Sequence, residues 1–263
     1  MTAIPAYPVS NRWERVLDLI FPPLCVGCRR IGRWICPHCW PHVAWLNDRT
    51  CGMCGVPSGS NPCLRCQTPS SPVRTVVAVA EFADDAREAV HALKYEGHHA
   101  ISSMMGRLMA STARDIEAHA VVPLSLHGSR RRERGYDQAR LLAKAVAVEL
   151  RVPYRQDGVE RIRKTRQQAT LSADDRRANV EGAFRSRLHL QGQTVLLVDD
   201  VCTTGATLES GARALQDVGA GQVVGLVFAV AERGTVTTGG RGESEDQAPG
   251  RQHRLLDRLP GPF

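Results

Sequence analysis

The stretch that decides the fold is Thr194–Ser210, "TVLLVDDVCTTGATLES". Its apolar run Thr194–Val198 predicts a buried strand. Two adjacent acids, Asp199 and Asp200, follow this strand directly, and Val201–Thr207 forms a small, hydroxyl-rich turn that leads into a helix. A strand, a loop and a helix in this order are typical of one repeat of a parallel α/β sheet.

Strand-like runs alternate with helical periodicity over most of the chain. Besides Thr194–Val198, strands are predicted at Val76–Ala80, Val121–Leu126 and Val223–Val230. Helices are predicted at Asp84–Tyr95, Ile101–His119, Asp137–Leu150 and Leu208–Val218. This alternation predicts an α/β domain with a mostly parallel sheet flanked by helices, in which a ligand lies beyond the carboxyl ends of the strands.

The turn after the two acids has the composition of a phosphate-binding loop. Backbone N–H groups at a loop and helix start attract an anion, Gly205 permits close approach, and Thr203, Thr204 and Thr207 add hydroxyl donors. The turn matches neither the Walker loop nor the dinucleotide-binding glycine motif. Because carboxylates repel phosphate, the two acids are expected to bind ribose hydroxyls and to help hold Mg²⁺. The residues therefore predict a sugar phosphate as ligand.

The cysteines predict a zinc module near the N-terminus. Eight of the nine form four Cys-x-x-Cys pairs, and two such pairs complete the tetrahedral thiolate set that zinc prefers. Two zinc ions are expected, in sites made of Cys25, Cys28, Cys36 and Cys39 and of Cys51, Cys54, Cys63 and Cys66. A crossed pairing stays open. His38 and His42 could replace a ligand, although exposed loop histidines are the favoured interpretation.

Four segments are expected along the chain. They are an amphipathic helix within residues 1–22, a double zinc ribbon at 23–68, the α/β domain at 73–232 and a disordered tail at 233–263. The linker-like "QTPSSPV" at 67–73 marks the boundary between the ribbon and the α/β domain. The segment "WPHVAWL" at 40–46 is expected to pack the two ribbons together, with base stacking as the alternative.

Composition and charge limit the class of protein and its partners. No window reaches the ~18 apolar residues of a membrane span, and the N-terminus lacks a secretory signal, so a cytoplasmic protein is expected. The formal net charge of +7 favours acidic partners, which are nucleic acid, a phosphorylated small molecule or both. Arginines gather in residues 130–140 and, with one lysine, in residues 161–177.

Resemblance sharpens this interpretation. The stretch "VLLVDDVCTTGAT" resembles the 5-phosphoribosyl-1-pyrophosphate (PRPP) motif of type I phosphoribosyltransferases. The stretches "VVPLSLHGSRRRERGYDQARLLAKAVA", "IRKTRQQATLSADDRRANVEGAF", "ALKYEGH" and "LDLIFPPLCVGC" resemble the competence protein ComF family, so the resemblance spans about residues 13–230. It implies a zinc ribbon module before a phosphoribosyltransferase-type domain, and a link to uptake and processing of transforming DNA.

The resemblance also implies roles for individual residues. Asp199 and Asp200 would bind the ribose 2- and 3-hydroxyls, with or without Mg²⁺. The 5-phosphate would be held by Thr203, Thr204, Gly205, Ala206 and Thr207. The pyrophosphate loop would lie in Pro123–Gln138 and use Arg134, Gly135 and Gln138. Residues 163–179 would form a mobile loop that stabilises departing pyrophosphate through Lys164, Arg166 and Gln168.

Two functions fit the sequence. One is a phosphoribosyltransferase with an unknown acceptor. The other is an accessory protein that binds single-stranded DNA through its phosphates and keeps the PRPP pocket as a sensor or a vestige. We favour a DNA-uptake protein with a working PRPP site and with other DNA-uptake proteins as partners. Lys94 could reach the site or could cap a helix end, and Cys202 is interpreted as a bystander thiol.

Overall fold

The computed structural model describes residues 22–46, 51, 71–95, 99–126, 132, 135–163 and 182–231. Several predictions fall outside these residues. They concern the N-terminal helix, the tail, most of the mobile loop, and the ligands Cys54, Cys63 and Cys66.

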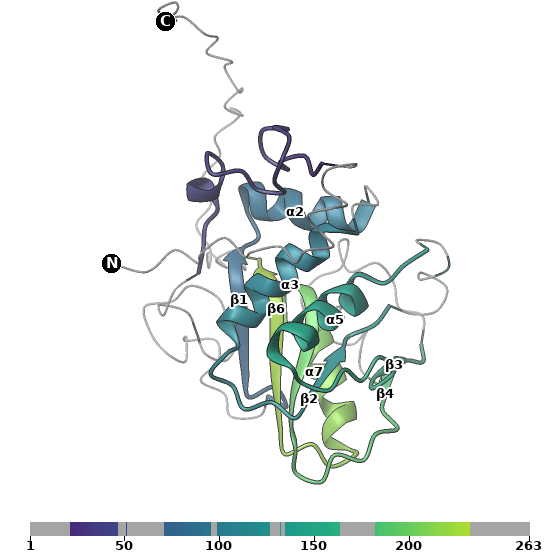
Figure 1. Cartoon of the computed structure of the whole chain (residues 1–263). Coiled ribbons are helices and arrows are strands. Elements are labelled where there is room, and N and C mark those ends of the chain that lie inside the picture. The colour runs from purple at the N-terminus through teal and green to yellow at the C-terminus, as the bar shows by residue number, and fades with distance from the viewer. Residues whose placement is uncertain are drawn as a thin grey trace, which may run out of the picture. The chain divides into compact units, whose positions relative to one another are not determined.

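A four-stranded parallel sheet forms the centre of the described structure (Figure 1). Its order is β1 (Thr75–Glu81), β6 (Gln222–Val230), β5 (Thr194–Cys202) and β2 (Ala120–Pro123). Every neighbouring pair in this order is parallel. The predicted parallel α/β sheet is thus confirmed, and the carboxyl ends of all four strands meet at one edge.

Helices cover both faces of the sheet because side chains of a strand alternate between them. On one face, Leu196 and Val198 share a buried cluster with α2 (Asp84–Tyr95), α3 (Ile101–Thr112) and α5 (Gln138–Leu150). On the other face, β5 side chains pack with α7 (Ala206–Gln216). This two-sided burial explains why β5 reads as a continuous apolar run.

Some predicted element bounds differ from the structure. The helix predicted at Ile101–His119 ends at Thr112, where the N–H of Ala113 bonds to two carbonyls of the last turn. Asp115 and Glu117 follow, and acidic side chains oppose the dipole at a helix C-terminus. The strand predicted at Val121–Leu126 ends at Pro123. The N–H of Leu124 still donates to Val198 of β5 at 2.8 Å, but the N–H of Leu126 donates to the Asp137 side chain, so the chain has left the sheet there.

A two-stranded antiparallel hairpin lies outside the main sheet and was not predicted. It pairs β3 (Glu160–Arg161) with β4 (Phe184–Arg185), so that Glu160 lies opposite Arg185. The guanidinium of Arg161 lies 5.2 Å from the centre of the Phe184 ring, within the distance at which a cation is attracted to an aromatic face. The hairpin therefore brackets the segment predicted to be the mobile loop.

The first zinc ribbon lies against the sheet and against α2 (Figure 1). Residues after its short helix η1 (Trp40–His42) run antiparallel to β1: the N–H of Leu46 donates to Val79 and that of Glu81 to Ala44, both at 2.9 Å. This contact with β1 was not anticipated for the 40–46 segment. It covers the free edge of β1, which would otherwise expose unpaired backbone groups.

The described residues contain no helix that meets the length and hydropathy needed to cross a membrane.

Candidate functional site

Both acids of the quoted stretch lie within β5, not after it. The strand continues to Cys202, which corrects the predicted end at Val198, and α7 then begins at Ala206, two residues before the predicted start. Because adjacent strand residues point to opposite faces, the two carboxylates diverge. Asp200, buried at 4% exposure, faces the α2 side of the sheet, and Asp199 is half-buried.

Lys94, at the end of α2, pairs with Asp200. Its Nζ lies 2.8 Å from Asp200 Oδ1, and the two side chains are only 20% and 5% exposed. Burial of the ammonium group lowers the pKa of Lys94, but the charge and hydrogen bond of Asp200 outweigh this and raise it. Lys94 therefore stays protonated at neutral pH and neutralises one of the two acids.

The other oxygen of Asp200 is buried and unsatisfied within the part of the chain that the structure describes. Asp200 Oδ2 is buried and has no hydrogen-bond partner among the described residues. A buried carboxylate oxygen without a partner is costly unless a ligand hydroxyl or a cation satisfies it. Oxygen donors are what Mg²⁺ prefers, so the acid pair fits either a ribose diol or a magnesium ion.

The ionised form of Asp199 is destabilised in the free protein. Burial, and then the charge of Asp200, raise the pKa of Asp199 from 3.8 to about 8, although its Oδ1 accepts a hydrogen bond from the N–H of Asp200 at 2.8 Å. The proton is thus held more tightly in the folded state than in the unfolded chain. The stability of the free protein should fall as pH rises from about 4 to about 8.

The Asp199→Asn variant should remove this pH dependence, because an amide keeps the acceptor oxygen without a charge. At pH 9, the free energy of unfolding of the ligand-free variant should exceed that of the wild type by about 1–3 kcal/mol. Urea denaturation at a series of pH values measures this difference. A matched control is Asp115→Asn, on the exposed turn after α3, which should leave the pH profile unchanged. A wild-type profile identical to that of Asp199→Asn would contradict the assignment.

The predicted phosphate loop forms the start of α7. Gly205 caps the helix with φ of 81°, a left-handed conformation that favours glycine. The N–H of Ala206 donates to the Thr204 hydroxyl at 3.4 Å, and the N–H of Glu209 bonds to the Gly205 carbonyl. The loop thereby presents the N-terminus of a regular helix beside the acid pair, where an anion is favoured.

The acids and the loop line one cavity of about 260 Å³. Six predicted site residues line it: Gln138, Asp199, Asp200, Thr203, Gly205 and Thr207. Thr204 and Ala206 are buried members of the loop that do not line the cavity, and Gly135 does not line it either. Arg134, Lys164, Arg166 and Gln168 lie outside the described residues.

The cavity also contains residues that were not assigned to it from the sequence. Lys94 lines the cavity, which decides between the two roles considered for it, a site residue or a helix cap. The stretch "ALKYEGH", which resembles the ComF family, was the sequence signal for the first role. Phe82, Leu126 and Arg161 line the cavity too. Leu126 lies in the predicted pyrophosphate loop and Arg161 in the second basic cluster, although neither was named as a contact, and no sequence pattern marked Phe82. Cys202 lines it although its exposure is only 3%, and the bystander interpretation of this thiol stays a prediction.

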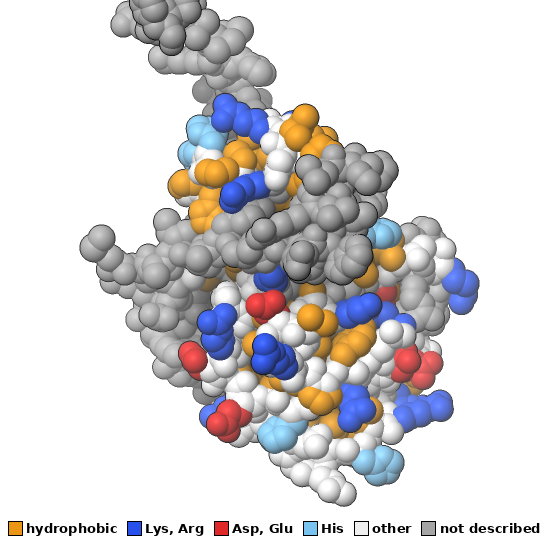
Figure 2. Space-filling view, in the orientation of Figure 1, with side chains coloured by type: hydrophobic (Ala, Val, Ile, Leu, Met, Phe, Trp, Pro, Cys, Tyr) orange, Lys and Arg blue, Asp and Glu red, His pale blue; other side chains and the backbone are white. Residues whose placement is uncertain are grey.

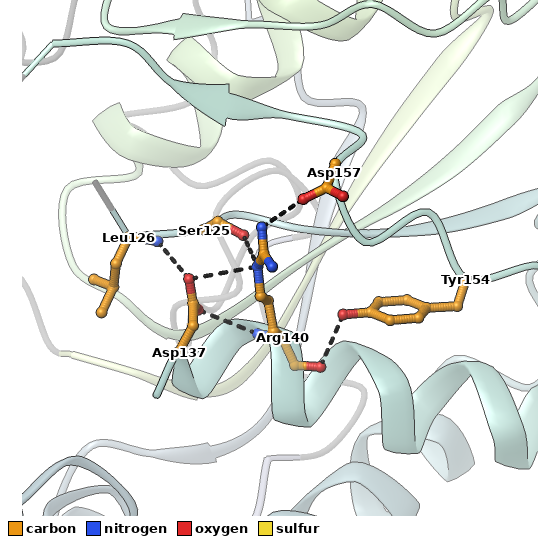
Figure 3. A network of polar contacts seen from close by, with 6 residues as sticks. All are labelled: Ser125, Leu126, Asp137, Arg140, Tyr154 and Asp157. Carbon is orange, nitrogen blue, oxygen red and sulfur yellow. Dashed lines mark hydrogen bonds and ion pairs between the residues drawn. The ribbon is translucent and has the colours of Figure 1, made fainter. Parts of the chain in front are cut away.

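The two ends of the predicted pyrophosphate loop are tied together by Asp137 (Figure 3). Its carboxylate accepts hydrogen bonds from the N–H of Leu126 at 2.9 Å and from the N–H of Arg140 at 3.3 Å, which also caps α5. The side chain of Arg140 in turn donates to Ser125 at 3.2 Å. Residues near both ends of the predicted loop are therefore tied to the first turn of α5.

The four cysteines predicted for the first zinc site lie together in the structure. The four sulfur atoms of Cys25, Cys28, Cys36 and Cys39 all lie within 4.8 Å of one another, which fits tetrahedral ligands ~2.3 Å from one zinc ion. A hydrogen bond from the backbone of Cys39 lowers the pKa of the Cys36 thiol to about 6, whereas burial raises the pKa of Cys39. Zinc binding by all four sulfur atoms would therefore release protons from the cluster. The group supports the sequential pairing for this site. His38 and His42 stand outside it and are exposed, as the favoured interpretation had it.

Comparisons with known proteins agree with both parts of the chain. A phosphoribosyl transferase domain model matches residues 137–241, and a double zinc ribbon domain model matches residues 16–71. The DNA utilization protein YhgH of Escherichia coli K12 is 33% identical over 78% of this chain and 96% of that protein. Competence protein F of Haemophilus influenzae is 29% identical over 76% of this chain and 87% of that protein.

Among solved structures, the orotate phosphoribosyltransferase of Mycobacterium tuberculosis in complex with PRPP is 25% identical, with a TM-score of 0.33, over 56% of this chain and 74% of that one. The chain matches a phosphoribosyl transferase domain and a double zinc ribbon, and it matches YhgH and competence protein F over 96% and 87% of their lengths. It therefore belongs to the competence protein ComF family.

Proposed function

We propose that the chain binds PRPP, together with Mg²⁺, in the cavity at the carboxyl ends of β5 and β2, and that it does so as a DNA-uptake protein. The observation that carries the proposal is the buried oxygen of Asp200. It lacks a partner in a cavity that also contains the phosphate loop, and its sister oxygen is already neutralised by Lys94. A ligand that is both an anion and a diol satisfies these groups together.

Each part of PRPP has a group suited to it. The 5-phosphate would lie at the start of α7, where Thr203, Gly205 and Thr207 line the cavity. The ribose hydroxyls would donate to Asp199 and Asp200. The pyrophosphate would lie toward Gln138, close to the clamped loop end at Leu126. When bound, Mg²⁺ would neutralise charge on the pyrophosphate, which eases its departure.

The role in DNA uptake is supported by the names of the relatives, which refer to DNA utilization and to competence. A net charge of +7 suits such a partner. In this proposal, transfer of the phosphoribosyl group to an acceptor would follow loss of pyrophosphate from C1. A second candidate is an accessory protein that binds single-stranded nucleic acid and keeps the pocket as a vestige, and the same relatives favour it.

Calorimetric titration with PRPP and Mg²⁺ tests the proposal. The zinc-loaded wild type should bind PRPP with micromolar affinity. The Asp199→Asn/Asp200→Asn variant should lose this binding, because amides cannot supply the charged oxygens that carboxyl groups can offer to the ribose hydroxyls and to Mg²⁺. The matched control Asp115→Asn/Glu117→Gln removes two exposed acids outside the cavity and should bind as the wild type does.

No binding by the wild type would reject the PRPP site and favour the second candidate. That candidate predicts binding of single-stranded DNA that weakens steeply as salt rises, since phosphate contacts release counterions. DNA affinity that does not change between low and moderate salt would contradict it.

A further inference from the structure

A second cavity, of about 340 Å³, lies next to the proposed PRPP cavity and has no role in the function described above. It is bounded by the end of β2, the start of α5 and the β3–β4 hairpin. Leu126 and Arg161 line both cavities, so the two are neighbours. The volume falls in the range of ~300–1,000 Å³ that is typical of pockets for small organic ligands.

The walls of the second cavity are basic. Four arginines line it, and two acids lie beside them: Arg140, Arg161, Arg185, Arg187, Asp157 and Glu160. Arg185 and Arg187 are exposed and come from one extended segment, where alternate residues share a face. A concave surface with excess positive charge concentrates the field and attracts anions.

Positive surface charge alone does not distinguish the second cavity from the rest of the surface. Figure 2 shows Lys and Arg side chains spread over the visible face of the described residues, with acidic side chains between them. What distinguishes the second cavity is that its arginines line a hollow. Guanidinium groups that converge on a hollow can bind one phosphate from several directions.

Arg140 is held in a fixed orientation at the wall of this cavity (Figure 3). Its Nε donates to the Ser125 hydroxyl at 3.2 Å, and its Nη2 lies 2.6 Å from Asp157 Oδ1. The Asp157 side chain is 77% exposed, and exposed ion pairs contribute little to stability. An oxygen anion on a ligand could therefore replace the Asp157 carboxylate at Arg140 with little cost.

We propose that this second cavity binds the phosphate group of a nucleotide, either a free nucleotide or one that belongs to a DNA strand, with Asp157 as the group that it displaces. The arginines would bind the phosphate, and the remaining volume would hold the sugar. A ligand in this cavity would lie directly beside PRPP. The inference goes beyond the PRPP site and does not require it.

Two variants change the cavity in opposite directions. Asp157→Asn removes the competing carboxylate and should tighten nucleotide binding about threefold, because an exposed ion pair is worth less than about 1 kcal/mol. Arg187→Gln removes a phosphate ligand and should weaken binding about tenfold. The probes are thymidine 5′-monophosphate, thymidine, and a short oligothymidylate with or without a 5′-phosphate, measured by calorimetry and fluorescence anisotropy. The matched control is Arg114→Gln, an exposed arginine after α3, which should leave every affinity unchanged.

The probes also separate the two sources of the phosphate. Tighter binding of the monophosphate than of the oligonucleotides identifies a free nucleotide, and the reverse order identifies a DNA strand. Equal binding of thymidine and its monophosphate would overturn the proposal, as would affinities that neither variant changes. Competitive displacement of the bound probe by PRPP or pyrophosphate would overturn it too, because the cavity would then be part of the PRPP site.

A PRPP titration of the same variants keeps the two proposals apart. Asp157→Asn and Arg187→Gln should bind PRPP as the wild type does, because neither residue lines the PRPP cavity. If the wild type binds no PRPP but its nucleotide affinity responds to both variants, the PRPP proposal fails and the second cavity stands.

Discussion

The Lys94→Met variant should lose about 2–4 kcal/mol of unfolding free energy, because it leaves the buried Asp200 carboxylate without its cation. Methionine keeps the length and apolar stem of lysine, so the packing of α2 changes little. The same variant should weaken PRPP binding at least tenfold, since the uncompensated charge of Asp200 repels a ligand with three phosphate groups. Urea denaturation and calorimetry measure the two effects.

A double-mutant cycle isolates the pair from the individual side chains. Lys94→Met combined with Asp200→Asn should recover most of the lost stability, because no buried charge then lacks a partner. The recovered variant should still bind PRPP poorly, since the ribose acceptor is gone. Lys144→Met, an exposed lysine on α5, is the matched control and should change neither quantity. Equal destabilisation by Lys94→Met and Lys144→Met would contradict the ion pair.

The Cys25→Ser variant should lose one equivalent of zinc and about 3–5 kcal/mol of unfolding free energy, because metal binding and folding of such a module are coupled. Cys25 is fully buried, and its sulfur accepts the backbone N–H of Cys36 at 3.3 Å. Zinc content by atomic emission and stability by urea denaturation measure the outcome.

Loss of this zinc should also weaken PRPP binding, because α2 connects the cysteine cluster with the proposed PRPP cavity. The Cys25–Cys28 turn contacts the first turn of that helix closely. A Cβ atom added to Gly27 would lie 2.5 Å from Asp85 Oδ1, which is too short for a van der Waals contact. Lys94 stands at the other end of the same helix. PRPP affinity should therefore fall in Cys25→Ser. The control Cys202→Ala should keep the full zinc content, since Cys202 is not part of the sulfur cluster.

Much of the fold could be predicted because local patterns carry it. The bounds predicted for α2, β1, α5 and β6 agree with the structure to within one residue, because apolar periodicity and turn residues act over short distances. The ends of β5, β2 and α3 were less accurate. There the strand or helix continues or stops according to its neighbours: β5 extends to Cys202 because β6 beside it pairs to the same level.

The candidate site also has parts that could be predicted from the sequence and parts that could not. The phosphate loop, the acid pair and the first cysteine cluster are continuous or closely spaced in sequence, so the residue types alone indicated their chemistry. The ion pair of Lys94 with Asp200 joins two distant segments, and the clamp of Asp137 on Leu126 closes a loop. Such contacts depend on how helices are placed on the sheet.

The sequence by itself thus determined the parallel α/β fold and the first cysteine cluster, and it indicated the sugar phosphate that we propose as ligand, because all of these follow from which groups stand next to one another along the chain. Only the tertiary structure decided which acid is neutralised, which buried carboxylate oxygen lacks a partner among the described residues, and that four arginines line a second cavity. The physical reason is that charge compensation and concavity act through space. They exist only once α2, α5 and the hairpin have packed around the carboxyl ends of the strands.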